Sequence, residues 1–192
     1  MVSKNILAAA VILVILIVSG GFYILQRPSA PAPTTTPAPT QKAMRLRSSD
    51  FEHNGRVPPK STCDGANISP QLSWEDVPEE TKSFALSMVD LDTPMGRFIH
   101  WLVYDIPKDA RSIGQGEVPE GSKQVQNDFG KKEYGGPCPP SGTHRYVFTI
   151  YALDTSHLEG VDENKGDFFR LVKEHTITQA ELIGLYSHTP PQ

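Results

Sequence analysis

The chain has 192 residues, of which 38% are hydrophobic, enough for one sizeable core. Residues 1–43 carry three basic residues and no acidic one, so residues 44–192 hold 15 basic and 22 acidic residues, a net charge of −7. This composition excludes a nucleic-acid-binding module, which depends on clustered Lys and Arg, as well as a disordered chain and a multi-span membrane protein.

Residues 1–27 are expected to anchor the chain in a membrane. Residues 6–25 carry no charge, and as a helix rising about 1.5 Å per residue they would span about 30 Å, the thickness of a bilayer's hydrocarbon core. A cleaved signal peptide is the alternative, because the densest apolar run is short and small residues follow it. Lys4 opposes Arg27, a slight positive-inside bias that favours a single span with the remaining chain outside the cytoplasm. With signal cleavage, the domain would instead be secreted.

The following segment, residues 28–43, is predicted to be a spacer. Pro, Ala and Thr make up 13 of its 16 residues. Such a composition cannot bury a core, and proline blocks regular secondary structure, so the segment is expected to be semi-extended. Residues 44–192 therefore form the folded domain.

Strand patterns dominate the first two-thirds of this domain. Long strands that are apolar on both faces are typical of the middle of a sandwich, covered from both sides. Such strands are predicted over 83–90, 98–106 and 145–153, with shorter candidates over 44–47 and 71–74.

A helix is predicted near the C-terminus, over residues 164–175, where apolar side chains recur with helical spacing. Residues 180–186 are either the end of this helical region or a last strand. Long Gly/Pro-rich loops, notably 112–121 and 134–142, separate the strands, and loops of this length usually carry function or are pinned to the core.

Three polar residues on these strands are candidates for a functional site. Asp90 continues the buried face of residues 84–88, and an unpaired buried carboxylate costs several kcal/mol; alternatively it turns into solvent or caps the next turn. His100 alternates onto one face with the apolar residues of 98–104, where a histidine is commonly a satisfied core residue. His144 lies between a Gly/Pro loop and a strand, where it either faces a cavity or is an ordinary loop residue.

The spacing of these residues does not indicate a metal or a nucleophile. His100, His144 and an aspartate could form a two-His, one-carboxylate site, but no HxxxH or CxxC spacing accompanies them. There is no GxSxG elbow, and local sequence places no serine beside either histidine. We therefore expect no metal, no cofactor and no catalytic residue.

Cys63 and Cys138 are the only cysteines of the chain. An even pair in a domain expected to face an oxidising compartment favours a disulfide, which would contribute about 4 kcal/mol in the chain-entropy model. Two unpaired thiols are the alternative, because a bridge requires Cα atoms within about 7 Å.

Several segments together resemble the phosphatidylethanolamine-binding protein family, in its prokaryotic, Raf kinase inhibitor-like branch. They are CDGANISPQLSW (63–74), DLDTP (90–94), HWLVYDIP (100–107), DFGKKEYGGPCPPSGTHRYVFTIYALD (128–154) and TITQAELIGLYS (176–187). The resemblance covers 44–190 and neither the anchor nor the spacer. It implies a mainly β fold, an antiparallel Greek-key β-sandwich with a few peripheral helices.

The resemblance also implies a small anion-accepting pocket in which a carboxylate orients an imidazole. Carried over motif by motif, its residues are Asp90, Asp92, His100, Gly136, Pro137, His144 and Tyr146. It places Cys63 and Cys138 next to the pocket rim, and Tyr146 near its mouth. Leu91 departs from the family motif, which usually has proline there, and this bears on the backbone of that loop.

The expected function is therefore non-catalytic binding or regulation by a membrane-tethered module whose pocket recognises a phosphate or other anionic group. Family members are linked to inhibition of kinases and serine proteases, which makes a protease or kinase the expected class of protein partner. The alternative is a hydrolase of phosphate or carboxylic esters with His100 or His144 as base, which requires a nucleophile or metal within hydrogen-bond reach.

Overall fold

The structure is a computed structural model that describes residues 42–161 and 164–188. The expected anchor (1–27) and nearly all of the spacer (28–43) lie outside the described residues. Within the described part of the chain, no helix is long and apolar enough to cross a membrane.

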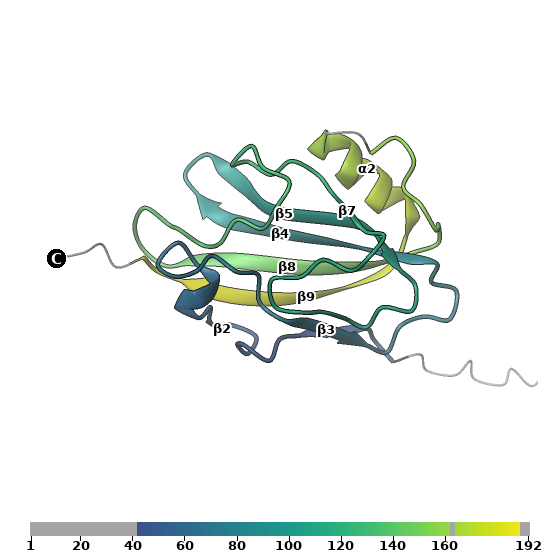
Figure 1. Ribbon diagram of the computed structural model, residues 1–192, viewed down its shortest axis with the longest axis horizontal. Helices are drawn as coiled ribbons and strands as arrows, with labels where there is room; N and C mark the ends of the chain where they lie inside the picture. Colours follow the sequence, from purple (N-terminus) through teal and green to yellow (C-terminus); the bar gives the residue numbers. More distant parts are fainter. Residues whose placement is uncertain (1–41, 162–163, 189–192) are drawn as a thin grey trace, which may run out of the picture. The chain divides into compact units, whose positions relative to one another are not determined.

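The described strands form two sheets (Figure 1). They are β1 (Arg45–Arg47), β2 (Gly55–Arg56), β3 (Leu72–Glu75), β4 (Ser83–Thr93), β5 (Gly96–Pro107), β6 (Ser112–Ile113), β7 (Lys123–Gln124), β8 (His144–Leu153) and β9 (Thr176–Tyr186). The small sheet has the order β1-β3-β6 and the large one the order β2-β9-β8-β4-β5-β7. All pairs are antiparallel except β2 with β9.

Both faces of the large sheet are covered, which confirms the interpretation of its apolar strands. One face packs on the small sheet through a core that includes Leu72, Trp74, Phe84 and Phe148. The other face packs on helix α2 (Lys165–His175) through Phe168 and Val172, among other side chains. Figure 1 shows α2 and the small sheet on opposite sides of the long strands.

Residues 180–186, for which the sequence left a helix end or a last strand open, belong to a long strand that follows the helix. Asn164 caps α2 by accepting a hydrogen bond from the Gly166 N–H at 2.8 Å. Thr176 is already extended, and residues 176–186 form β9 beside β8. Only this α-helix and a 3-10 turn, η2 (Pro59–Ser61), occur in the described ranges, fewer helices than expected.

A β-bulge in β5 changes the side of the sheet that His100 faces. Met88 pairs with Trp101 and Val89 with Ile99, so His100 is the extra residue on its strand. The expectation that it shares a face with Leu102 and Tyr104 was wrong, because the bulge shifts the alternation by one residue. His100 contacts Phe98 and Tyr146 instead, on the face turned toward the small sheet.

The predicted disulfide between Cys63 and Cys138 is present, with Cα atoms 5.4 Å apart. It joins the segment 61–67 to the loop 134–138, called the rim loop below. Three hydrogen bonds also join these segments. They are Cys63 N–H to Pro137 O at 3.1 Å, Gly136 N–H to Asn67 Oδ1 at 2.7 Å, and Tyr134 O–H to Ser61 O at 2.7 Å.

Replacing both cysteines by serine should therefore destabilise the domain without unfolding it. The bridge closes a separation of 75 residues, which the chain-entropy model equates with about 4 kcal/mol as an upper value. We expect the free energy of unfolding to fall by about 2–4 kcal/mol in urea denaturation, with an unchanged circular dichroism spectrum. An unaltered unfolding midpoint would show that the bridge does not stabilise the fold.

Candidate anion-binding site

The strand register brings the predicted site residues to one end of the large sheet. Asp90 lies opposite Tyr146 of β8 on one side and opposite Phe98 of β5 on the other. Cross-strand neighbours face the same side of a sheet, and so does His144, two residues before Tyr146. His144 pairs with the end of β9, at the left in Figure 1.

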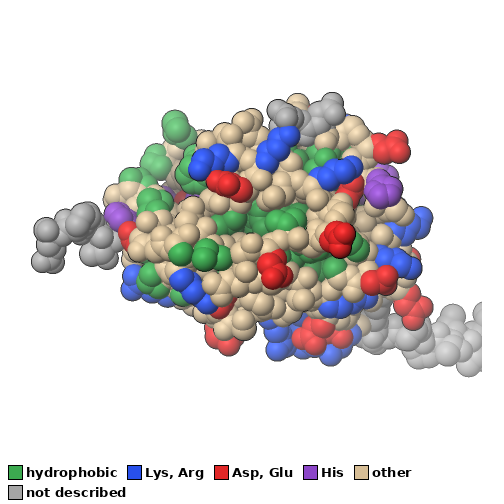
Figure 2. Space-filling model, in the orientation of Figure 1, with side chains coloured by type: hydrophobic (Ala, Val, Ile, Leu, Met, Phe, Trp, Pro, Cys, Tyr) green, Lys and Arg blue, Asp and Glu red, His purple; other side chains and the backbone are tan. Residues whose placement is uncertain are grey.

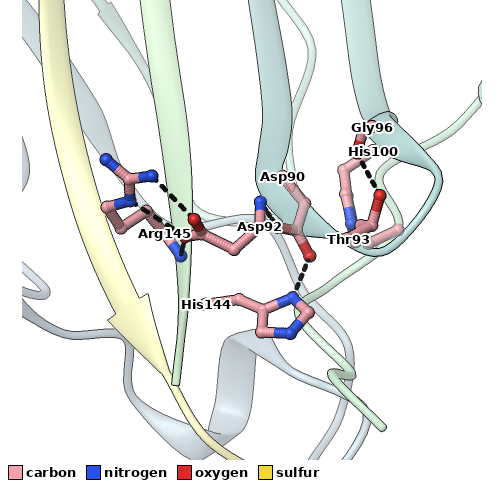
Figure 3. Close-up of polar contacts among 8 residues, drawn as sticks. Asp90, Asp92, Thr93, Gly96, His100, His144 and Arg145 are labelled. Carbon is pink, nitrogen blue, oxygen red and sulfur yellow. Dashed lines mark hydrogen bonds and ion pairs between the residues drawn. The ribbon is translucent and has the colours of Figure 1, made fainter. Parts of the chain in front are cut away.

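Asp90 and His144 form a buried pair. Nδ1 of His144 lies 2.7 Å from Oδ2 of Asp90, while Asp90 Oδ1 accepts a hydrogen bond from the Asp92 N–H at 2.9 Å (Figure 3). Only 3% of Asp90 and 7% of His144 is exposed. The alternative that Asp90 turns into solvent was therefore wrong; it has the partner that its burial demands.

His100 is held by the rim loop. Its Nδ1 lies 2.6 Å from the Gly135 carbonyl oxygen, and the Gly135 N–H donates to the His100 carbonyl at 3.1 Å. A carbonyl only accepts, so Nδ1 carries the proton of the neutral ring and Nε2 is bare. Burial lowers the pKa of His100, and the Gly135 bond and the charge of Asp90 offset this only in part. His100 is consequently neutral at pH 7.

Tyr146 lies between the two imidazoles. Its ring meets that of His100 edge-on at 5.1 Å and stacks with that of His144 at 6.5 Å between centroids. The side chain is fully buried, so Tyr146 lies at the centre of the cluster and not at its mouth as expected. Its hydroxyl lies within hydrogen-bond reach of the Asp90 carboxylate and of the Cys138 backbone. Burial raises the pKa of Tyr146, and the negative charge of Asp90 raises it further.

Asp92 holds β4 against β8. Both carboxylate oxygens are taken by Arg145, through Nε at 2.9 Å and a terminal guanidinium nitrogen at 2.7 Å (Figure 3). These hydrogen bonds lower the pKa of Asp92 to about 2. We therefore interpret Asp92 as a positioning residue. Leu91, which stands where the family motif usually has proline, lies within the continuous strand β4 and is 42% exposed. Its presence therefore leaves the strand intact.

The rim loop contributes shape more than free donors. The Gly136 N–H is already bonded to Asn67, and the Pro137 carbonyl accepts from Cys63. A Cβ on Gly136 would lie 2.5 Å from both Ser61 O and Asn67 Oδ1, so only glycine allows this close approach.

Sequence reasoning missed Asn127, Phe129 and Gly135. The Asn127 side chain donates to the His100 carbonyl at 3.1 Å, and the Phe129 ring lies 5.2 Å from that of His100. The asparagine that opens the turn-like NDFG stretch was the available signal for the first of them. A cavity of about 320 Å³ opens beside the rim loop; Asn127, Phe129 and Gly135 line it, but Asp90, His100, His144 and Tyr146 do not.

A metal at the predicted site is not favoured by this geometry. Within the part of the chain that the structure describes, the ligand atoms of Asp90, His100 and His144 do not come within 4.8 Å of one another as a group. Nδ1 of each histidine is already engaged by the protein.

The lowered pKa of His100 predicts a pH-dependent stability. Below the unfolded pKa of about 6.5, the unfolded chain takes up a proton that the folded state resists, so stability is lost as the pH falls. Between pH 7 and pH 5, we expect the free energy of unfolding to decrease by at most about 1.4 kcal/mol per pH unit from this residue. His100→Asn, which keeps a donor for Gly135, should flatten the slope measured by urea denaturation.

His157→Asn is the matched control for this measurement, because the side chain of His157 is 73% exposed. It should leave the slope of the wild type intact. Equal slopes for the wild type and His100→Asn would contradict the assignment of the effect to His100.

Comparison with known proteins supports the family resemblance. The model of the phosphatidylethanolamine-binding protein family matches residues 47–187. The UPF0098 proteins of Methanothermobacter thermautotrophicus and Aquifex aeolicus are 45% and 46% identical, each over 74% of this chain and over 98% and 88% of their own lengths.

Solved structures agree. YbcL of E. coli, described as a new member of the mammalian PEBP family, matches with a TM-score of 0.72 and 31% identity over 77% of this chain and all of its own. The homologue CT736 from Chlamydia trachomatis matches with a TM-score of 0.71 and 37% identity, over 77% of this chain and 99% of its own. The chain therefore belongs to the phosphatidylethanolamine-binding protein family.

Proposed function

We propose that this domain binds a small anionic group, such as a phosphate, at the cluster of Asp90, His100, His144 and Tyr146, without chemistry on the ligand. The observation that carries the proposal is the buried pair of Asp90 and His144, with the Tyr146 ring lying between the two imidazoles. A carboxylate that engages one ring nitrogen orients the imidazole and leaves its second nitrogen for a ligand.

The imidazolium form of His144 would supply the positive charge for such a ligand. In the neutral state both rings donate through Nδ1 to the protein, so neither Nε2 carries a hydrogen. A donor toward the ligand from His144 therefore requires the imidazolium form of the ring, with hydrogens on both nitrogens. Asp90 compensates the charge of an imidazolium at His144, whereas burial keeps His100 neutral.

The surroundings favour an anion attached to an apolar organic group. Leu91, Met95 and Phe129 are 42%, 96% and 46% exposed, and all three lie at the end of the sheet that holds the site. Figure 2 shows apolar side chains gathered at that left end of the molecule. An inorganic ion alone would not use this surface.

A hydrolase is the second candidate, because a histidine paired with a buried carboxylate is also the geometry of a general base. That mechanism needs a nucleophile or a bound water. In the described ranges, no hydroxyl or thiol forms a hydrogen bond with His144. Binding is therefore the better-supported function.

We further propose that residues 1–27 tether the domain to the membrane, outside the cytoplasm, with residues 28–43 as spacer. The apolar run of residues 6–25 and the disulfide support this location, because disulfides persist in oxidising compartments. An extracytoplasmic protease would then be a more accessible protein partner than a cytoplasmic kinase.

His144→Ala should weaken anion binding by the full-length protein. Losing a charge-assisted hydrogen bond costs on the order of 1.5–3 kcal/mol, which corresponds to about a ten- to hundred-fold loss of affinity. The measurement is calorimetric titration with a phosphomonoester.

His175→Ala is the control for this titration. His175 also pairs with an aspartate, Asp154, at 2.8 Å, but it is the last residue of α2 and precedes the end of β9 opposite to the one that pairs with His144. It should bind like the wild type. Equal affinity of His144→Ala and the wild type would overturn the binding site, and ester turnover that disappears in His144→Ala would favour the hydrolase.

The anchor is tested by fractionation. If residues 6–25 remain as a membrane span, the protein should sediment with membranes at its full 21.1 kDa and resist carbonate extraction. Recovery of a soluble product that begins near Gly21 would show that the segment is a cleaved signal peptide.

A further inference from the structure

The C-terminal end of the described chain adds a histidine to the disulfide. Nδ1 of His188 lies 4.0 Å from Sγ of Cys63, and the ligand atoms of Cys63, Cys138 and His188 all lie within 4.8 Å of one another. Both cysteines are exposed, and the His188 side chain is 26% exposed. The cluster is thus accessible to reductants and to ions.

We propose that reduction of the Cys63–Cys138 disulfide creates a site for a soft divalent metal ion such as zinc, with both thiolates and His188 as ligands. A dithiol or phosphine reductant supplies two electrons, and two protons complete the two thiols. Metal binding then releases both thiol protons, and each sulfur donates a lone pair to the ion. The third lone pair comes from the imidazole nitrogen of neutral His188.

The existing distances are close to those of a tetrahedral site. With Zn–S bonds of about 2.3 Å and Zn–N bonds of about 2.1 Å, tetrahedral angles place sulfur and nitrogen about 3.6 Å apart and two sulfurs about 3.8 Å apart. The Cys63–His188 separation of 4.0 Å differs little from the first value. After reduction, side-chain rotation of the two cysteines provides the second.

The two cysteines remain neighbours when the covalent bond is gone. The three hydrogen bonds between the segment 61–67 and the rim loop do not involve the sulfurs. One of them starts at the Cys63 N–H itself and ends at Pro137, the residue before Cys138. Reduction therefore leaves a preorganised dithiol, which lowers the entropic cost of metal binding.

Asp64 completes the arrangement. Its Oδ1 lies 2.6 Å from the same Nδ1 of His188, and its Oδ2 accepts a hydrogen bond from the Tyr186 hydroxyl. A metal ion at Nδ1 requires the neutral ring to keep its proton on Nε2, which frees Asp64 Oδ1 from this contact. The fourth position of the metal then falls beside an anchored carboxylate, a common zinc ligand.

The test is metal titration of the purified full-length protein before and after reduction by a phosphine. Cobalt gives a thiolate-to-metal absorption band, and zinc competition with a chromophoric chelator gives the affinity. We expect one equivalent per reduced chain, none in the disulfide form, and a roughly tenfold or greater loss of zinc affinity in His188→Ala. His157→Ala, at a histidine that is 73% exposed and is not part of the cluster, should bind like the wild type.

Two results would overturn the proposal. One is a reduced wild type that binds zinc no more tightly than the disulfide form. The other is equal zinc affinity of His188→Ala and the wild type. The same result is expected if reduction unfolds the domain, so the circular dichroism spectrum of the reduced protein is recorded to establish whether the domain is still folded. Neither result affects anion binding at Asp90 and His144, because that site does not include the sulfurs.

Discussion

The burial of the Asp90 carboxylate is the constraint around which one end of the domain is organised. A carboxylate with 3% exposure requires partners, and removing one partner of a buried pair typically costs about 3–5 kcal/mol. The partners are the His144 imidazole and the backbone N–H of Asp92. For His144 to reach Asp90, β8 must begin level with the end of β4, and the pairing of Asp90 with Tyr146 sets this register.

Two features outside the buried pair keep that register in place. Arg145 donates hydrogen bonds to the Asp92 carboxylate from its guanidinium and its backbone N–H. Because Arg145 directly follows His144, these bonds also hold the start of β8 in place beside β4. In β5, the bulge at His100 adds one residue without moving Asp90 from its partner Phe98. The bulge places a second imidazole on the side of the sheet that faces Tyr146.

Much of this fold could be predicted from the sequence, because the patterns that determine its long strands and its helix are local in the sequence. The three long strands follow from apolar runs and α2 from helical spacing; the cysteine pair follows from parity and redox context. The short strands β2, β6 and β7 contain only two residues each and exist through their partners, so no local pattern marks them. The predicted face for His100 was wrong for the same reason, because a bulge depends on how two strands pair and no local pattern marks it.

The site was partly predictable. Asp90 and His144 were brought together by the family resemblance and by the need of a buried carboxylate for a partner, and the structure pairs them directly. Asp92 was predicted to bind ligand because its motif gives a residue type and not a direction, and its carboxylate is used by Arg145. Asn127 and Gly135 act through a side-chain amide and a carbonyl that contact His100, and no spacing in the sequence encodes such contacts.

The two histidines use the same nitrogen for the protein and yet differ in what they offer a ligand. His100 donates to a neutral carbonyl, and burial lowers its pKa more than the nearby charges of Asp90 and Asp128 raise it. His144 donates to a carboxylate, which compensates the charge of an imidazolium. The proposed pocket therefore combines an acceptor at His100, a donor at His144 in its imidazolium form and the Tyr146 hydroxyl. A phosphate group that retains one hydroxyl matches this set, since its hydroxyl can donate to His100 while its charged oxygens accept from His144 and Tyr146.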